Sequence, residues 1–153
     1  MDDIKKILVV SRMTKYCKEA VQQGISLARK YNAELYLIHV VHDPFGLEGW
    51  NLPMVSLEKD YKKLLEEAKE DLDNMVARER EKGLQVTELI REGDPTKEVL
   101  TAVKDFNVDL MIMLAHEEGR LEHFLFGRTN DDLIRKMPCS IMLVKKEPES
   151  VDW

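Results

Sequence analysis

The residues best suited to do chemistry gather between Leu110 and Thr129, in the stretch LMIMLAHEEGRLEHFLFGRT. It begins as an apolar run typical of a buried strand and ends as the start of a helix. His116 and His123 lie between the two, together with Glu117, Glu118 and Glu122. Histidine and carboxylate are ligands that zinc accepts. However, the spacing is not that of an HExxH metal site and no third ligand is evident, so solvated loop histidines are the simpler interpretation.

A nucleophile beside a base is the second chemistry to consider. Ser11, Thr14 and Cys17 follow the first apolar run of the chain, and His42 follows the second. Such side chains could meet at one edge of a sheet. No nucleophile-elbow motif supports a catalytic pair, and His39 is expected to lie in the sheet interior. The chain is therefore predicted not to be an enzyme.

Short apolar runs alternate with amphipathic helical patterns along the whole chain. The strands predicted from these runs are Ile7–Val10, Leu35–Val41, Gln85–Ile90, Asp109–Leu114 and Ser140–Lys145. The predicted helices are about Lys15–Tyr31, ended by Asn32; Leu57–Lys82, with Ser56 as N-cap and Gly83 after its end; Asp94–Phe106, with Asp94 as N-cap and Pro95 as first residue; and Thr129–Lys136.

This alternation predicts an α/β fold. Right-handed crossovers would give a parallel sheet with helices on both faces. Such sheets bind ligands beyond the carboxyl ends of their strands. The loops at that edge are residues 11–16, 42–56, 91–95 and 115–128.

Length and charge restrict the classes of function. The 153 residues predict one domain over residues 1–147 and a charged tail over residues 148–153. The formal net charge of -6 argues against nucleic acid or an anionic membrane as partner, and no run approaches the roughly 20 apolar residues of a membrane helix. The first apolar run is too short for a signal peptide. Cys17 and Cys139 form no CxxC, so free thiols and a cytoplasmic location are expected.

An unusually apolar loop precedes the second helix. Within HDPFGLEGWNLPMVS, the Phe45–Met54 segment concentrates aromatic and aliphatic side chains between prolines and glycines. One interpretation is a lid over the ligand crevice or a docking patch for a partner protein, because aromatic residues and methionine are typical of interface cores. The other is that these side chains fold back on the helices of the domain itself.

Several short segments occur in a characteristic order. They are KKILVV, LARKYNAELYLIHVV, REGDPTKEVL, DLMIML and FGRTNDDLIRKMPCSIMLVK. Together they resemble the universal stress protein (UspA) family over nearly the whole chain. The resemblance implies a role in stress response and a doubly wound, Rossmann-like domain similar to the adenine nucleotide alpha hydrolases. It also implies five parallel strands in the order 3-2-1-4-5.

Members of that family that bind ATP carry an aspartate after the first strand and the motif G-x2-G-x9-G, followed by Ser or Thr, after the fourth. Their glycines let backbone N–H groups approach phosphate oxygens. Seven positions of this chain correspond to that nucleotide site. They are Ser11 at the aspartate; Leu114, Glu117 and Gly127 at the glycines; Arg128 at the hydroxyl, followed by Thr129; and Val41, at a position whose backbone contacts the adenine ring.

These replacements oppose phosphate binding, and only Gly127 keeps its residue type. Leu114 and Glu117 carry a Cβ where the motif needs a bare, often left-handed backbone, which costs about 1 kcal/mol or more each. A carboxylate about 4 Å from a phosphate charge adds on the order of 4 kcal/mol at an effective dielectric of about 20. The chain is thus predicted to need no cofactor and not to bind ATP in the usual way. The alternative is ATP or AMP binding by a rearranged loop, in which Arg120 and Arg128 replace the backbone contacts.

The last predicted strand, SIMLVK, lies at an edge of the sheet if the family's strand order holds. An exposed apolar edge is a liability unless it is covered. The resemblance implies that this edge pairs with its twofold mate in a homodimer, with Ile141 and Leu143 near the axis.

Overall fold

Strand β1 (Lys6–Ser11) lies at the centre of a parallel sheet. This computed structural model describes residues 3–11, 17–41, 55–115 and 129–145. The other strands are β2 (Glu34–Val41), β3 (Val86–Glu92), β4 (Leu110–Leu114) and β5 (Ser140–Val144). Their order is β3-β2-β1-β4-β5, and every pair is parallel. The predicted fold class and strand order are confirmed.

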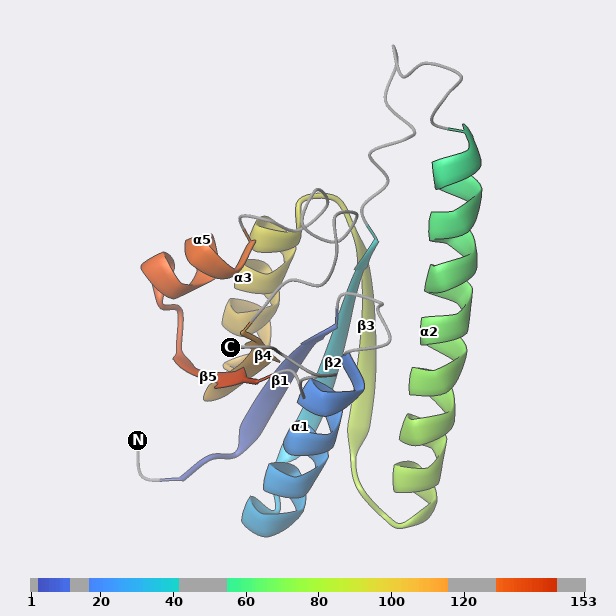
Figure 1. Cartoon of the computed structure of the whole chain (residues 1–153). Coiled ribbons are helices and arrows are strands. Elements are labelled where there is room, and N and C mark those ends of the chain that lie inside the picture. The colour runs from blue at the N-terminus through green and yellow to red at the C-terminus, as the bar shows by residue number, and fades with distance from the viewer. Residues whose placement is uncertain (1–2, 12–16, 42–54, 116–128, 146–153) are drawn as a thin grey trace, which may run out of the picture.

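Helices cover both faces of this sheet (Figure 1). Helices α1 (Cys17–Tyr31) and α2 (Val55–Glu81) lie on one face. Helices α3 (Pro95–Phe106) and α5 (Thr129–Lys136) lie on the other. The long α2 runs beside β2 and β3, while α5 lies near β5 at the opposite side of the molecule. The domain is therefore three-layered, with the strands in the middle.

The core consists of two clusters because successive strand residues point to opposite faces. Ile7 and Val9 of β1 belong to the cluster under α1 and α2, whereas Leu8 and Val10 belong to the cluster under α3 and α5. All four side chains are at most 5% exposed. A strand with two buried faces must be apolar at every position, which is why ILVV is a continuous run.

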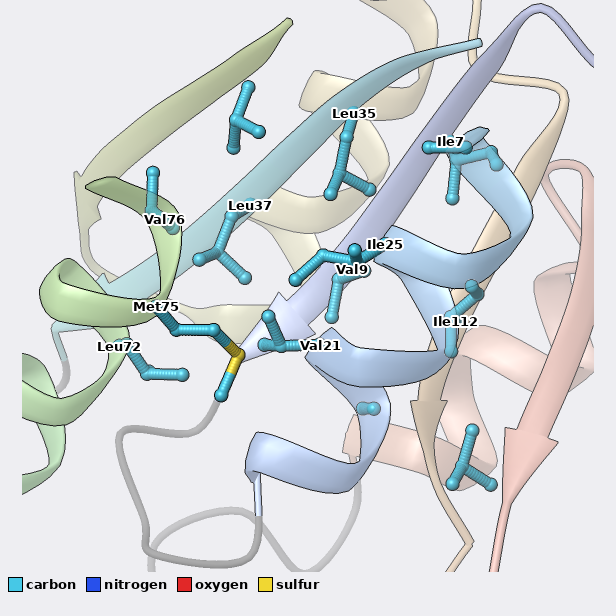
Figure 2. Packing of buried hydrophobic residues seen from close by; sticks show 14 of the residues in the cluster. Ile7, Val9, Val21, Ile25, Leu35, Leu37, Leu72, Met75, Val76 and Ile112 are labelled. Atoms are coloured by element: carbon cyan, nitrogen blue, oxygen red, sulfur yellow. The ribbon is translucent and has the colours of Figure 1, made fainter. Parts of the chain in front are cut away.

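Helix α2 contributes to the first cluster through three residues of its inward stripe. Figure 2 shows Leu72, Met75 and Val76 pointing towards Leu37 of β2 and Val21 of α1. All three are buried. The centre of α2 is thus joined to both the sheet and the neighbouring helix by apolar contacts.

The helix ends follow most of the predicted signals. Asn32 and Gly83 have the left-handed φ values, 54° and 95°, that stop α1 and α2. Asp94 accepts a hydrogen bond from the Thr96 N–H at 3.1 Å, and Pro95 is the first residue of α3. One cap was predicted wrongly. Because α2 begins at Val55, Ser56 lies inside the helix and not at its N-cap.

Strand β3 extends further than its apolar pattern predicts. Its last two residues, Arg91 and Glu92, pair with Val40 and Val41 although the prediction ended the strand at Ile90. An edge strand tolerates charged side chains at its exposed positions, so hydrophobic periodicity stops before the backbone pairing does.

In the described part of the chain, no helix has the length and apolar character needed to cross a membrane.

Gly24 sets the distance between α1 and the sheet. A Cβ at this position would lie 2.4 Å from Val9 Cγ2 and 3.2 Å from Leu35 Cδ1. The helix can pack this closely against β1 and β2 only because Gly24 has no side chain.

The Gly24→Val variant is expected to lose about 1–3 kcal/mol of unfolding free energy, because its added carbons overlap Val9. The difference in helix propensity favours valine by only about 0.3 kcal/mol, so packing decides the sign. Urea unfolding followed by circular dichroism measures the change. The exposed neighbour supplies the control, since Gln23→Val should change stability by less than about 0.5 kcal/mol. Equal losses in both variants would contradict the close approach.

Candidate functional site

The predicted nucleotide-site positions that the structure describes lie along one edge of the sheet. Ser11 ends β1, Val41 ends β2 and Leu114 ends β4. These strands are adjacent and parallel, so their carboxyl ends meet at one edge. The strand order reverses beside β1, which is where such sheets bind ligands. The other predicted residues of this edge lie outside the described residues: Glu117, Gly127, Arg128, His116, His123, Thr14, His42 and the Phe45–Met54 loop.

Leu114 already has its side chain and its backbone engaged. It is 2% exposed and belongs to the core cluster beneath α1 and α2. Its carbonyl accepts a hydrogen bond from Asn130 Nδ2 at 2.7 Å. The next backbone donor, the Ala115 N–H, bonds to the Val144 carbonyl at 2.9 Å. The end of β4 is therefore committed to packing and sheet pairing.

The start of α5 brings negative charge to the same edge. Thr129 and Asn130 are buried at this helix start, and Asp131 and Asp132 occupy its first turn. Carboxylates near a helix N-terminus are favourable because they complement the helix dipole. An incoming phosphate would meet like charges at this helix end.

Ser11 and His39 stand next to each other across β1 and β2. They are register partners and are only 2% and 1% exposed. Within the described residues, neither ring nitrogen of His39 has a hydrogen-bond partner, so the imidazole does not bond to the serine hydroxyl. The pKa of His39 is lowered to about 4, mainly by burial and also by the Lys69 charge, while Asp73 partly opposes this. The ring is therefore neutral at physiological pH.

A charged cluster beside His39 was not identified from the sequence. Glu88 of β3 lies 4.0 Å from the His39 ring, measured from Oε2 to Nε2. Lys69 and Asp73 of α2 form an ion pair of 2.7 Å. Burial, followed by the neighbouring Asp73, raises the pKa of Glu88. The available signal was that Glu88 lies two residues after Val86 and so on the inward face of β3.

Two hollows among the described residues lie away from this edge. One of about 510 Å³ lies between α1 and α2 and includes Arg29 and Lys82. The other, of about 490 Å³, lies beside the start of β3 and includes Glu34 and Gly83. Among the described residues, no group of three or more histidine, cysteine, aspartate or glutamate side chains is placed to hold a metal ion.

Comparison with known proteins agrees with this fold. Residues 3–145 match the universal stress protein family. Universal stress protein MJ0531 of Methanocaldococcus jannaschii is 30% identical over 93% of this chain and 82% of its own length. Universal stress protein MJ0577 of the same organism is 26% identical over 94% of this chain and 96% of its own length. This chain belongs to the universal stress protein family.

Solved structures of the family share its architecture. The structure of MJ0577 matches this universal stress protein with a TM-score of 0.68 and 25% identity, over 95% of this chain and 99% of that chain. A family protein from Arabidopsis thaliana, solved with AMP bound, matches with a TM-score of 0.61 and 16% identity, over 95% of this chain and 94% of that one. The second likeness concerns the fold alone.

Asn130 is expected to hold the end of β4 in this universal stress protein. The Asn130→Ala variant removes the donor to the buried Leu114 carbonyl, so the unfolding free energy should fall by about 1–3 kcal/mol. Urea unfolding measures the loss. Arg135→Gln, an exposed change on the same helix, is the control and should stay within about 0.5 kcal/mol. An unfolding free energy that stays unchanged in Asn130→Ala would mean that this hydrogen bond does not secure the end of β4.

Proposed function

We propose that this universal stress protein acts in the cytoplasm as a homodimeric interaction module in stress response, and that it does not bind ATP in the manner of the family's nucleotide-binding members. The observation that supports the absence of the usual ATP binding is the way in which Leu114 is buried and bonded. Where those members have a glycine, this chain has Leu114, whose side chain is buried and whose backbone carbonyl accepts a hydrogen bond from Asn130. A cytoplasmic location is supported by Cys139, a free and half-buried thiol that suits a reducing compartment.

The proposed role is one of binding, without catalysis. Ser11 and His39 are the nucleophile and the base that the described carboxyl edge brings closest, since they are register partners. Both are buried, and the imidazole makes no hydrogen bond to the hydroxyl. A serine nucleophile needs a base within hydrogen-bond reach and access to substrate, and this pair supplies neither.

The dimer proposal is supported by the exposed edge at β5. In the described part of the chain this strand pairs only with β4. Leu143 is 46% exposed and Ile141 is half-buried. An apolar edge strand with free backbone groups favours pairing with a second copy of itself. A partner protein at the Phe45–Met54 loop stays a prediction.

Nucleotide binding is tested by two measurements on the same preparation. Freshly purified protein should release no stoichiometric adenine nucleotide on denaturation, as judged by chromatography. Titration calorimetry with ATP, ADP and AMP should give weak or undetectable heats. Two added Cβ atoms at about 1 kcal/mol each already reduce affinity roughly 30-fold. ATP incubated with the protein should yield no ADP above the buffer rate.

A matched pair of variants tests whether the lost glycine at position 117 is what weakens ATP binding. Glu117→Gly restores a family glycine and removes a carboxylate, whereas Glu118→Gly removes a carboxylate without restoring a motif position. ATP affinity should rise more in the first variant than in the second. Stoichiometric ATP in untreated wild-type protein would overturn the proposal.

The alternative function is nucleotide binding through a rearranged loop. It is considered because a family protein from Arabidopsis thaliana that shares this fold was solved with AMP bound. Under this alternative, wild-type protein binds AMP or ATP, and affinity falls in Arg120→Ala or Arg128→Ala because these cations replace the backbone contacts. Binding that survives both substitutions would argue against the rearranged loop.

The dimer is tested by a charge at the edge strand. Wild-type protein should show twice the 17.8 kDa chain mass in light scattering at micromolar concentration. Leu143→Lys should shift this towards the monomer, because a buried lysine at the interface loses its hydration. Tyr31→Lys is the matched control, since Tyr31 is 52% exposed at the end of α1, away from β5. A monomeric wild type, or an equal loss of dimer in Leu143→Lys and Tyr31→Lys, would contradict an interface at β5.

A further inference from the structure

His39 is the least satisfied buried group in the described structure. Its ring is 1% exposed, and both nitrogens lack a hydrogen-bond partner among the described residues. Buried polar atoms are almost always paired, because each unsatisfied one costs about 1–3 kcal/mol. A histidine kept in this state has a reason to be there beyond packing.

The side chain of His39 points towards α2. It shares its strand face with Leu35 and Leu37, which belong to the core under α1 and α2. Its register partners are Ser11 on β1 and Ile90 on β3. On this face α1 contributes the apolar residues Ala20, Val21 and Ile25. The titratable groups around the ring therefore come from β3 and α2.

Three charged residues connect those two elements. Glu88 of β3 lies 4.0 Å from the imidazole, and when it is protonated it donates a hydrogen bond to the Asp73 carboxylate of α2. One turn earlier on α2, Lys69 pairs with Asp73 at 2.7 Å. The Arg80 charge partly opposes the rise in the pKa of Glu88, although the Arg80 side chain itself donates to the Val86 carbonyl. Protonated Glu88 is thus a polar tie between the sheet and the middle of α2, whereas two ionised carboxylates would repel each other.

A second tie holds the end of the same helix. Arg80 Nε and Nη2 both donate to the Val86 carbonyl, at 3.1 and 2.8 Å. In addition, the Glu79 carboxylate pairs with Arg29 of α1 and lies 3.6 Å from Lys82. Neither contact involves a histidine. The end of α2 is therefore fixed at pH values where a histidine changes charge.

We propose that His39, Glu88, Asp73 and Lys69 form a proton-operated latch: when His39 takes up a proton, the part of α2 around Lys69–Val76 is released from the sheet while its end, at Arg80, stays attached. The inference is independent of whether this universal stress protein binds nucleotide. Release would uncover Leu72, which is 1% exposed when the latch is closed. The molecule would then present an apolar surface more often in acid than at neutral pH.

The direction in which pH changes the closure of α2 follows from the pKa of His39 in the closed state. There the pKa of His39 is lowered from 6.5 to about 4, first by burial and then by Lys69. Once α2 lifts, the ring is hydrated and its pKa returns towards 6.5. The open form therefore binds the proton more tightly, and closure weakens as the pH falls from about 6.5 to about 4.

Glu88 acts in the opposite direction. Its pKa is raised in the closed state, mainly by burial, so its protonation stabilises closure as the pH falls. The Glu88→Gln variant is uncharged at every pH and removes this opposition. From the two pKa values of His39, the opening constant of that variant should rise roughly 20-fold between pH 7 and pH 5. The wild-type increase should be smaller.

Amide hydrogen exchange in the full-length protein measures the opening. After correction for intrinsic exchange rates, protection of residues 69–76 should fall roughly 20-fold in Glu88→Gln between pH 7 and pH 5, while α3 keeps its protection. In His39→Leu this pH-dependent loss should disappear. Equal loss of protection in α2 and α3 would mean global unfolding and would overturn the latch.

Histidine titration by NMR gives a second, independent test that needs no change at His39. In wild-type protein the His39 resonances should titrate well below pH 6. Lys69→Gln removes a charge that lowers the pKa of His39, so that pKa should rise. Lys63→Gln removes an exposed lysine from the same helix and should leave it unchanged. A wild-type His39 pKa near 6.5, or equal shifts in both variants, would refute the arrangement.

Discussion

The burial of β1 on both faces is the constraint on which the rest of this structure depends. Leu8 and Val9 point in opposite directions, and each is fully buried. Since neither face of the strand meets water, unpaired polar groups are costly along its length and become tolerable where it ends. Ser11 is the polar residue that closes the strand. The polar chemistry at this edge thus follows from the packing of the layers, before any ligand is considered.

Helix α2 shows two ways of keeping an ionisable group inside such a core. Glu79 is 8% exposed and is paired with Arg29 of the adjacent helix. An unpaired buried carboxylate would be strongly destabilising, so this pairing is obligatory. His39, beneath the same helix, stays neutral instead, with its pKa lowered by burial. The first solution pairs the carboxylate with a cation, whereas the second keeps the His39 ring neutral and so depends on pH.

The sequence predicts features that rest on local patterns, and it does not predict contacts that form only in the folded chain. Strands β1 and β4 were recognised because a buried parallel strand is a continuous apolar run, and the ends of α1 and α2 because Asn32 and Gly83 take left-handed backbone. The latch was missed since its members lie on three elements joined only in the folded chain. Glu88 had a weak signal, an acid two residues after the buried Val86. Backbone pairing beyond Ile90 left no apolar pattern to read.

Leu114 links the core to the loss of the family's phosphate motif. A glycine there would free the backbone for a phosphate, but it would also remove a side chain that is 2% exposed. Deleting a buried leucine side chain costs about 2–5 kcal/mol, a large part of the stability of a typical domain. Core packing and a nucleotide cradle therefore compete for one position. In this chain Leu114 serves packing, so under the proposed function ATP binding would require compensating changes in the core as well as in the loop.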